Sequence, residues 1–251
     1  MIQYIKSTEN RIIKLVKHLS KKGERDKNSL FIAEGVRLVR EAIADGKPEF
    51  ILTTSPCKDF VGTQYIVSDE LFEKLSDTRT PQGIMALCPM PRWDEGILCS
   101  ARLVLVCENI SDPGNLGTML RTAEAAGADA VILAGNTVDL YNPKTVRSTM
   151  GSVFRVPVFV GDTYVDKLGE YGFTLAVTCL DGAIDLYKAE TVGKKVALAI
   201  GSEAHGISKA LENKADLKIK IPMWGKVESL NAAIAASVCL YECRRRLESQ
   251  E

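Results

Sequence analysis

Short, almost wholly apolar segments recur through the second half of this 251-residue chain, and they constrain its fold more than any other feature. Each is long enough for one strand, and helical patterns lie between most of them. Strands that are apolar nearly throughout are typical of a parallel sheet covered by helices on both faces. A long helix is expected at about 229–247. The strand candidates are LVLVCENI at 103–110, AVILAG at 130–135, VPVFV at 156–160, TLAVTCL at 174–180, KVALAIG at 195–201 and LKIKIP at 217–222.

The first 90 residues alternate strand and helix patterns on a smaller scale, which predicts a small α/β sandwich. Apolar residues recur at helical spacing over about 8–22, and a second helix is predicted over about 35–45. Strands are expected at 31–33, 50–52, 65–67 and 84–87.

Prolines and the turn-rich sequence WDEG place a linker at about 89–101. The sequence therefore predicts an N-terminal domain over 1–95 and a C-terminal domain over 101–251.

The formal net charge is zero, but residues 1–28 carry eight basic against three acidic side chains, a local net charge of +5. A basic arm on a neutral body is typical of contact with a polyanion. A solvated helix face with a charged turn would have the same composition.

The cysteines indicate a reducing compartment. None of the seven forms a Cys-x-x-Cys pair, and Cys107, Cys179 and Cys239 stand in apolar runs, which predicts buried free thiols in a cytoplasmic protein. With only two histidines and no further ligand cluster, the sequence argues against a structural zinc site. No apolar run approaches the roughly 20 residues that cross a bilayer, so we expect no membrane segment.

The sequence SDPGNLGTMLR at 111–121 follows a predicted strand and opens a helix. Ligands of open α/β sheets bind at the carboxyl ends of strands, so this connection is well placed for a site. Asp112 and Asn115 are natural N-caps, and capping alone would explain the turn. Arg121, about a turn and a half into the helix, is also placed to bind a phosphate.

In AIGSEAHGIS at 199–208, a strand runs into an acidic turn flanked by glycines. Gly201 allows a ligand to approach the backbone closely, and Glu203 can accept a hydrogen bond from a hydroxyl. His205 can act as a general base, although a surface turn residue is the simpler interpretation. The chain has no Gly-x-Gly-x-x-Gly pattern here and no phosphate-cradling lysine loop, which argues against dinucleotide or nucleoside-triphosphate binding.

In IKIPMWGKVESLN at 219–231, a strand ends at Pro222 and an irregular loop leads to the last helix. Ser229 is a natural N-cap for that helix. The backbone groups of the loop need partners other than a neighbouring strand, and a ligand with hydrogen-bonding edges can supply them. The alanines after Asn231 favour close helix packing, which is typical of a core.

Together these segments resemble the SpoU (TrmH-like) family of RNA 2′-O-ribose methyltransferases, in the SPOUT superfamily. The resemblance covers about 101–251, in the family's order and at its usual separations. FIAEGVRLVREAI at 31–43 is similar, less specifically, to the family's ribosomal-protein-like N-terminal RNA-binding domain. The matching sequences are DPGNLGTMLRTAEAAG at 112–127, IGSEAHGIS at 200–208 and IPMWGKVESLNAAIA at 221–235.

The resemblance implies a fold and an activity that periodicity cannot show. It implies a deep trefoil knot in the C-terminal domain, a homodimer formed through that domain, and S-adenosylmethionine as the methyl donor for an RNA ribose. The backbones of Gly201, Ile221 and Leu230 match positions that hold the adenine and ribose of this cofactor. Thr178 and Met223 are their expected neighbours.

The resemblance also implies catalytic and RNA-binding residues. Arg121 matches the arginine proposed to activate the attacking 2′-hydroxyl, and the polar residues around it are Asn115, Glu203, Ser229 and Asn231. Arg147 matches an arginine thought to bind RNA phosphate. The basic arm adds Lys14, Lys17, Lys21 and Arg25 as expected RNA contacts. The sequence departs from the family at NAAIA, where valine and serine more often follow the asparagine.

A guanidinium stays protonated near neutral pH. We therefore prefer a mechanism in which Arg121 stabilises the developing alkoxide while a phosphate oxygen or water takes the proton. Ribosomal RNA is the preferred substrate, with transfer RNA as the alternative. A non-catalytic RNA-binding protein of the same fold, or a small-molecule enzyme on an open α/β sheet, are the competing classes. The residues that argue against the first are intact: Asn115, Arg121, Glu203 and Asn231. The missing glycine fingerprint and the basic arm argue against the second.

Overall fold

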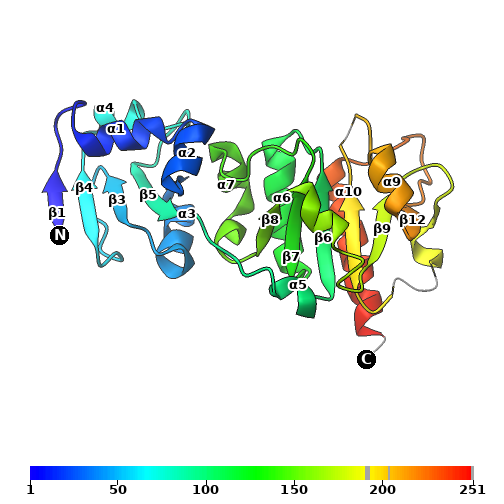
Figure 1. The fold of residues 1–251 in the computed structure, drawn as a ribbon. Helices are drawn as coiled ribbons and strands as arrows, with labels where there is room; N and C mark the ends of the chain where they lie inside the picture. Colours follow the sequence, from blue (N-terminus) through cyan, green and yellow to red (C-terminus); the bar gives the residue numbers. More distant parts are fainter. Residues whose placement is uncertain (190–192, 203, 250–251) are drawn as a thin grey trace. The chain divides into compact units, whose positions relative to one another are not determined.

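The computed structural model describes residues 1–189, 193–202 and 204–249, and the chain divides into two compact units (Figure 1). Unit 1 comprises Met1–Arg92 and Asp139–Arg155. Unit 2 comprises Trp93–Val138 and Val156–Glu251. The chain thus returns to unit 1 for the segment 139–155, and nothing in the sequence pattern signals this excursion.

Unit 1 is built on a mixed five-stranded sheet with the strand order β1-β4-β3-β5-β2. β1, β4 and β3 run parallel to one another, whereas β5 is antiparallel to both β3 and β2. The elements of unit 1 are β1 (Ile2–Tyr4), α1 (Arg11–His18), α2 (Lys22–Asn28), β2 (Leu30–Glu34), α3 (Val36–Glu41), the π-helix η1 (Ala42–Gly46), β3 (Phe50–Thr53), β4 (Thr63–Ile66), α4 (Asp69–Glu73), β5 (Ile84–Pro89), α7 (Pro143–Thr149) and the 3-10 helix η2 (Ser152–Phe154).

The first helix is shorter than the sequence pattern predicts. Asn10 caps α1 by accepting a hydrogen bond from the Ile12 N–H at 2.8 Å, and Ile13 and Val16 are buried against the sheet. The prediction of one helix over 8–22 is wrong, because Lys21 is extended and α2 begins at the next residue. The apolar repeat ends at Leu19, and the polar residues that follow start a second helix.

The segment 139–155 is held in unit 1 by ring packing and by charge. The Phe31 ring lies 4.8 Å from the Tyr141 ring and 5.6 Å from the Phe154 ring, measured between centroids. Arg155 Nη1 donates to the carboxylates of Glu41 at 2.6 Å and Asp45 at 2.8 Å. Local helix and strand patterns cannot reveal such contacts, because they join residues more than 100 positions apart.

Unit 2 contains the parallel sheet that the sequence predicts. Within the described residues this sheet has seven strands, all parallel, in the order β10-β12-β9-β11-β6-β7-β8. The elements of unit 2 are α5 (Ile97–Ser100), β6 (Leu103–Glu108), α6 (Pro113–Ala125), β7 (Ala130–Ala134), β8 (Val158–Val160), α8 (Asp162–Asp166), β9 (Thr174–Thr178), β10 (Ile184–Asp185), the 3-10 helix η3 (Leu186–Lys188), β11 (Val196–Ile200), α9 (Lys209–Lys214), β12 (Leu217–Lys220) and α10 (Ala232–Glu248).

The helices α6 and α10 pack together against the centre of this sheet, and the red C-terminal helix in Figure 1 is α10. The hydroxyl groups of Thr122 of α6 and Ser237 of α10 form a hydrogen bond of 3.1 Å, and Cys239 of α10 is fully buried.

The expected linker at 89–101 is only partly irregular, because β5 runs to Pro89 and α5 lies within it.

All seven cysteines are free thiols, and burial raises the pKa of Cys107 and of Cys243 to about 12. Cys179, which stands in an apolar run, is only half-buried, because β9 ends one residue before it.

None of the helices among the described residues is both long and apolar enough to span a bilayer. No cluster of three potential metal ligands occurs in the part of the chain that the structure describes.

Candidate active site

The carboxyl ends of three adjacent strands bring the predicted cofactor residues to one edge of the sheet of unit 2. β12, β9 and β11 are neighbours and run parallel, so Ile221, Thr178 and Gly201 follow or end them on the same side. The Thr178 hydroxyl donates to the Ala199 carbonyl of the next strand at 3.2 Å. The sequence motifs are far apart in the chain, but the parallel register places these three residues together.

The loop that follows β11 folds back tightly on its own backbone. A Cβ at Gly201 would lie 2.1 Å from the carbonyl carbon of Gly206, closer than any real side chain atom approaches. Ser202 and Gly206 exchange two backbone hydrogen bonds, of 3.1 and 2.8 Å. His205 is exposed, as the simpler interpretation expects. Glu203 lies outside the described residues.

A buried carboxylate holds the far end of this loop. Glu108, at the end of β6, is only 8% exposed. It accepts hydrogen bonds from the Ser208 N–H and the Ser208 hydroxyl, each at 2.7 Å. Ser208 in turn caps α9 by accepting from the Leu211 N–H at 3.2 Å. This chain of bonds ties Ser208 and the start of α9 to the end of β6.

The backbone of the loop after β12 is not used in backbone pairing among the described residues. Residues 221–230 take part in no backbone–backbone hydrogen bond with any described residue. Met223 and Leu230 are half-buried, whereas Trp224 is 87% exposed. Ligand groups with hydrogen-bonding edges can satisfy such a backbone, which would otherwise depend on water.

Asn231, rather than Ser229, caps the last helix. Its side-chain oxygen accepts from the N–H groups of Ala233 at 2.9 Å and Ile234 at 3.3 Å, so α10 begins two residues later than a Ser229 cap would allow. Ser229 is exposed in the loop before it. The prediction of a Ser229 cap is wrong, and Ser229 remains available for another role.

Two predicted catalytic residues meet at the ends of α6 and α10. The Asn231 amide donates to the Asn115 side-chain oxygen at 3.0 Å. Asp112 caps α6, as predicted, by accepting from the Asn115 N–H at 2.8 Å. Arg121 lies further along α6 with its side chain exposed. The motifs at 111–121 and 219–231 therefore form one structural unit.

Comparisons with known proteins agree with this geometry. Residues 102–241 match the model of the SpoU rRNA Methylase family, and residues 10–86 match that of an MRM3-like substrate binding domain. RlmP of Bacillus subtilis, a 23S rRNA (guanosine(2553)-2′-O)-methyltransferase, is 40% identical over 97% of this chain and 100% of its own. The chain belongs to the SpoU rRNA methylase family.

Solved structures support the same assignment. An rRNA methyltransferase from Sinorhizobium meliloti with bound AdoMet has a TM-score of 0.87 at 30% identity, over 98% of both chains. The SpoU methyltransferase AviRb from Streptomyces viridochromogenes, in complex with AdoMet, has a TM-score of 0.84 at 28% identity, over 96% of this chain and 99% of its own. This SpoU methylase is therefore an RNA methyltransferase that uses S-adenosylmethionine, as the resemblance predicts.

The strand-end loops of the SpoU methylase fit the chemistry of this cofactor. S-adenosylmethionine carries no phosphate, so it needs neither a glycine-rich phosphate loop nor a fixed lysine. Its adenine and ribose present hydrogen-bonding edges, and the loop 221–230 presents backbone groups without described backbone partners. Gly201 adds a strand end with no side chain.

The RNA contacts predicted for the SpoU methylase lie in unit 1 and differ in accessibility. Lys17 and Lys21 are exposed, and Lys14 forms a 2.6 Å ion pair with Glu9. Arg147 Nη2 donates to Asp77 at 3.0 Å. The expectation for Arg25 is not supported by its position: it is 4% exposed and donates to the carbonyls of Leu19 and Ser20 and to Asp139. Arg25 holds unit 1 together instead of facing solvent.

Sequence reasoning missed Glu108. Its signal is a single charged residue at the end of the otherwise apolar run LVLVCE. Ligands of open α/β sheets bind at the carboxyl ends of strands, so a charge at this position marks a candidate site. A smaller charge network joins α9 to β12. Glu212 of α9 accepts from Lys209 at 2.7 Å and from Lys218 of β12 at 2.8 Å. Hydrogen bonding from Lys209 and then from Lys218 lowers the pKa of Glu212 to about 2.

Proposed function

We propose that this SpoU methylase transfers the methyl group of S-adenosylmethionine to a ribose 2′-hydroxyl of ribosomal RNA. The observation that carries the proposal is the meeting of Thr178, Gly201 and Ile221 at one edge of a parallel sheet. The full-length similarity to RlmP, a 23S rRNA 2′-O-methyltransferase, favours ribosomal over transfer RNA. That similarity extends through unit 1 as well as unit 2.

In this proposal the strand-end loops bind the cofactor mainly through their backbones. Gly201, Ile221 and Leu230 hold the adenine and ribose, and Thr178 and Met223 complete the walls. The cofactor supplies an electrophilic methyl group when it is bound. Glu108 anchors Ser208 through two hydrogen bonds. This anchor would help the loop after β11 to hold the cofactor, which would lower the entropy cost of reaching the attacking geometry.

The side chains of the helices then act on the RNA hydroxyl. Arg121 stabilises the alkoxide that develops as the 2′-hydroxyl attacks, and a phosphate oxygen or water accepts its proton. The Asn115–Asn231 pair orients the ribose, with Ser229 and Glu203 as further polar contacts. Arg147, Lys14, Lys17 and Lys21 bind phosphates and hold the RNA in place, in a salt-dependent way.

The assembly that we propose is a homodimer formed through unit 2. Ile234 and Tyr241 stand seven residues apart on α10 and are 51% and 54% exposed, so they form an apolar face with no partner among the described residues. Large exposed apolar side chains on one helix face are typical of an interface. Arg121, on the neighbouring helix α6, would then lie near the dimer interface.

The knot and the location of the protein complete the proposal. We propose that the C-terminal chain, with the loops 201–208 and 221–230, forms a trefoil knot, and that the protein acts in the cytoplasm. Free thiols, four of them buried, favour a reducing compartment.

The proposal is tested by incubating the protein with ribosomal RNA or transfer RNA and labelled S-adenosylmethionine, and by mapping the modified nucleotides by mass spectrometry. We expect a 2′-O-methylated nucleotide in the large ribosomal RNA. Arg121→Ala serves as the inactive control. Label found only on bases would contradict the ribose assignment, label only in transfer RNA would contradict the substrate, and absence of cofactor binding in calorimetry would favour a non-catalytic RNA-binding protein.

A further inference from the structure

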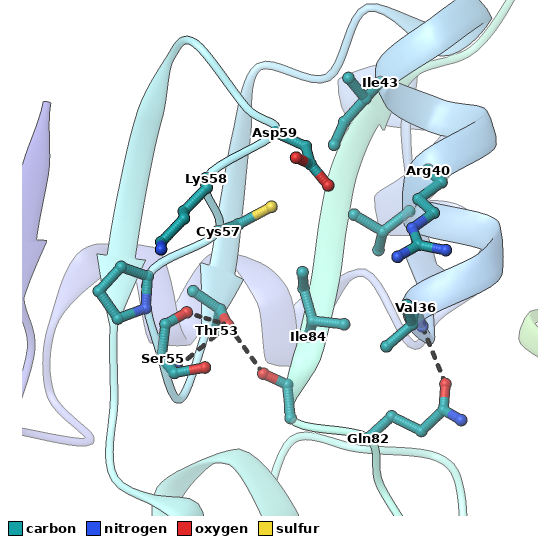
Figure 2. Close-up of a pocket in the computed structure, with 13 residues that line it drawn as sticks. Val36, Arg40, Ile43, Thr53, Ser55, Cys57, Lys58, Asp59, Gln82 and Ile84 are labelled. Atoms are coloured by element: carbon teal, nitrogen blue, oxygen red, sulfur yellow. Dashed lines mark hydrogen bonds between the residues drawn. The ribbon is translucent and has the colours of Figure 1, made fainter.

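A hollow of about 230 Å³ opens on unit 1 and is lined by none of the residues of the candidate active site. It lies between α3 with η1 on one side and the connection from β3 to β4 on the other (Figure 2). A neighbouring depression of about 440 Å³ continues past Arg37, and the two share Val36, Arg40 and Gln82. All the residues that line them belong to the segment matched by the substrate-binding-domain model.

Part of the wall of the hollow is apolar. Val36, Ile43 and Ile84 face it from α3, η1 and β5, and Val36 is 40% exposed (Figure 2). An apolar side chain left open inside a hollow costs free energy unless a ligand covers it. The flat face of a nucleobase or a ribose is a surface of this kind.

The rim of the hollow carries charge of both signs. Arg40 from α3 and Asp59 from the facing loop point toward it (Figure 2). Glu41 is already paired with Arg155 at 2.6 Å, whereas neither Arg37 nor Arg40 has an ion-pair partner in the described parts of the chain. Two unpaired guanidinium groups, three residues apart on one short helix, are suited to a phosphate. A carboxylate opposite them can accept hydrogen bonds from a base amino group.

The frame of the hollow is fixed before any ligand binds. The Gln82 side-chain oxygen accepts from the Val36 N–H at 2.9 Å, which leaves its amide nitrogen for a ligand. The Thr53 hydroxyl donates to the carbonyls of Ser55 at 2.8 Å and Gly83 at 3.0 Å (Figure 2). Glu34 accepts from the Thr78 hydroxyl at 2.9 Å and so anchors the loop that leads to Gln82.

We propose that this hollow binds one unpaired nucleotide of the RNA substrate. Arg40 holds its phosphate, the apolar wall covers its base or ribose, and Asp59 and Gln82 bond to the polar edge of the base. Unpaired nucleotides fit the site because their base edges and faces are free, whereas those of a duplex are stacked and paired. The inference rests on the proposed function, since it takes the substrate to be RNA.

The test measures the affinity of the full-length protein for two RNAs by fluorescence anisotropy over a range of salt concentrations. One is a hairpin with an unpaired loop, and the other is a fully paired duplex with the same stem. We expect Arg40→Ala to weaken hairpin binding about tenfold, and to lower the slope of log Kd against log salt by about one. Val36→Ala should weaken it roughly threefold without changing that slope.

Lys74→Ala is the matched control, because it removes one exposed positive charge from unit 1 outside the hollow. It should leave both affinities within about twofold. If Arg40→Ala, with an unchanged unfolding midpoint, behaves like Lys74→Ala, the site is refuted. Equal losses on hairpin and duplex would refute the choice of an unpaired nucleotide. If free nucleoside monophosphates competed at the concentration at which the hairpin binds, RNA would be refuted as the source of the ligand.

Failure of the proposed function would look different. Wild-type protein that binds S-adenosylmethionine in calorimetry but neither RNA would overturn the RNA substrate, and the inference with it. Wild-type protein that binds and methylates RNA, with Arg40→Ala indistinguishable from wild type, would overturn the hollow alone.

Discussion

The sheet edge of unit 2 and the hollow of unit 1 are built from different parts of the chain. At the sheet edge, the groups that we propose for the cofactor are mostly backbone atoms, and Gly201 has no room for a side chain. In the hollow, the groups offered are long side chains such as Arg40 and Gln82, on an apolar wall. One site depends on the path of the main chain, and the other on which side chains project from it.

This difference has an energetic consequence. Backbone groups have no rotamer entropy to lose when a ligand binds, whereas an arginine loses up to about 2 kcal/mol of rotamer entropy. The sheet edge therefore suits one small cofactor bound in one pose. The hollow suits a larger substrate that is held by many weak and salt-sensitive contacts. Substitutions at the two sites should accordingly fail in different ways.

The largest effect is expected at Arg121, the exposed guanidinium of unit 2. Arg121→Ala should lower kcat about 10² to 10³-fold, because it removes a donor aimed at developing negative charge. The affinity for S-adenosylmethionine should stay within about twofold. Single-turnover methylation and calorimetry separate the two quantities. Arg121→Lys with nearly full activity and unchanged pH dependence would exclude specific guanidinium chemistry.

Gly201→Ala should have the next largest effect. The added Cβ would lie 2.1 Å from Gly206, and a backbone cannot move aside as a side chain does. We expect a cost of about 3 kcal/mol, which is roughly a hundredfold in cofactor affinity if the loop alone distorts. Gly169→Ala, at an exposed glycine of unit 2 with open space around it, is the control. Equal cofactor affinities in the two variants would show that the loop does not bind the cofactor.

Glu108→Gln tests whether the buried carboxylate fixes the loop 201–208. An amide can accept from the Ser208 N–H or hydroxyl, but its NH₂ group then faces the other donor. The expected loss is about 2 kcal/mol of unfolding free energy, with cofactor affinity about tenfold weaker. Urea unfolding and calorimetry measure these losses, and Glu170→Gln at an exposed site of unit 2 is the matched control. If the unfolding free energy and the cofactor affinity both kept their wild-type values, Glu108 would have no role in the site.

The smallest effect is expected on stability when the pH is lowered. Lys209 and Lys218 lower the pKa of Glu212 to about 2 from 4.5, so its ion pairs stabilise the fold above about pH 4.5 and are lost as the pH falls toward 2. Because these are surface pairs, the contribution is small and screened by salt. Between pH 7 and pH 3, the urea midpoint of the wild type should fall slightly more than that of Glu212→Gln. A larger fall of the urea midpoint in the variant would show that Glu212 does not stabilise the fold through these ion pairs.

Much of unit 2 could be predicted from the sequence because its strands are buried on both faces. The six apolar runs each contain an observed strand, and the motifs after them lie at the predicted sheet edge. The pattern missed β1 and β10, which are short and carry too few buried residues to show a period. It also placed the last helix cap at Ser229, because serine and asparagine cap equally well.

The hollow and the excursion of the chain could not be predicted in this way. The residues of the hollow stand at 36–43, 53–59 and 82–84, and the pairing of β5 with both β2 and β3 brings them together. Arg25 shows the same limit. Its place in a basic arm suggested RNA contact, but its burial depends on Asp139, more than 100 residues away. Spacing along a chain reveals period and order, whereas these sites depend on long-range contact.

The most direct measurement is a crystal structure of the protein with S-adenosylhomocysteine, the product of methyl transfer. We predict that its adenosyl group lies at the carboxyl ends of β9, β11 and β12, with hydrogen bonds to the backbones of Gly201, Ile221 and Leu230. Its sulfur should face the Asn115–Asn231 pair. A ligand bound elsewhere in unit 2, or one held by side chains while these three backbones stay uninvolved, would contradict the site described above.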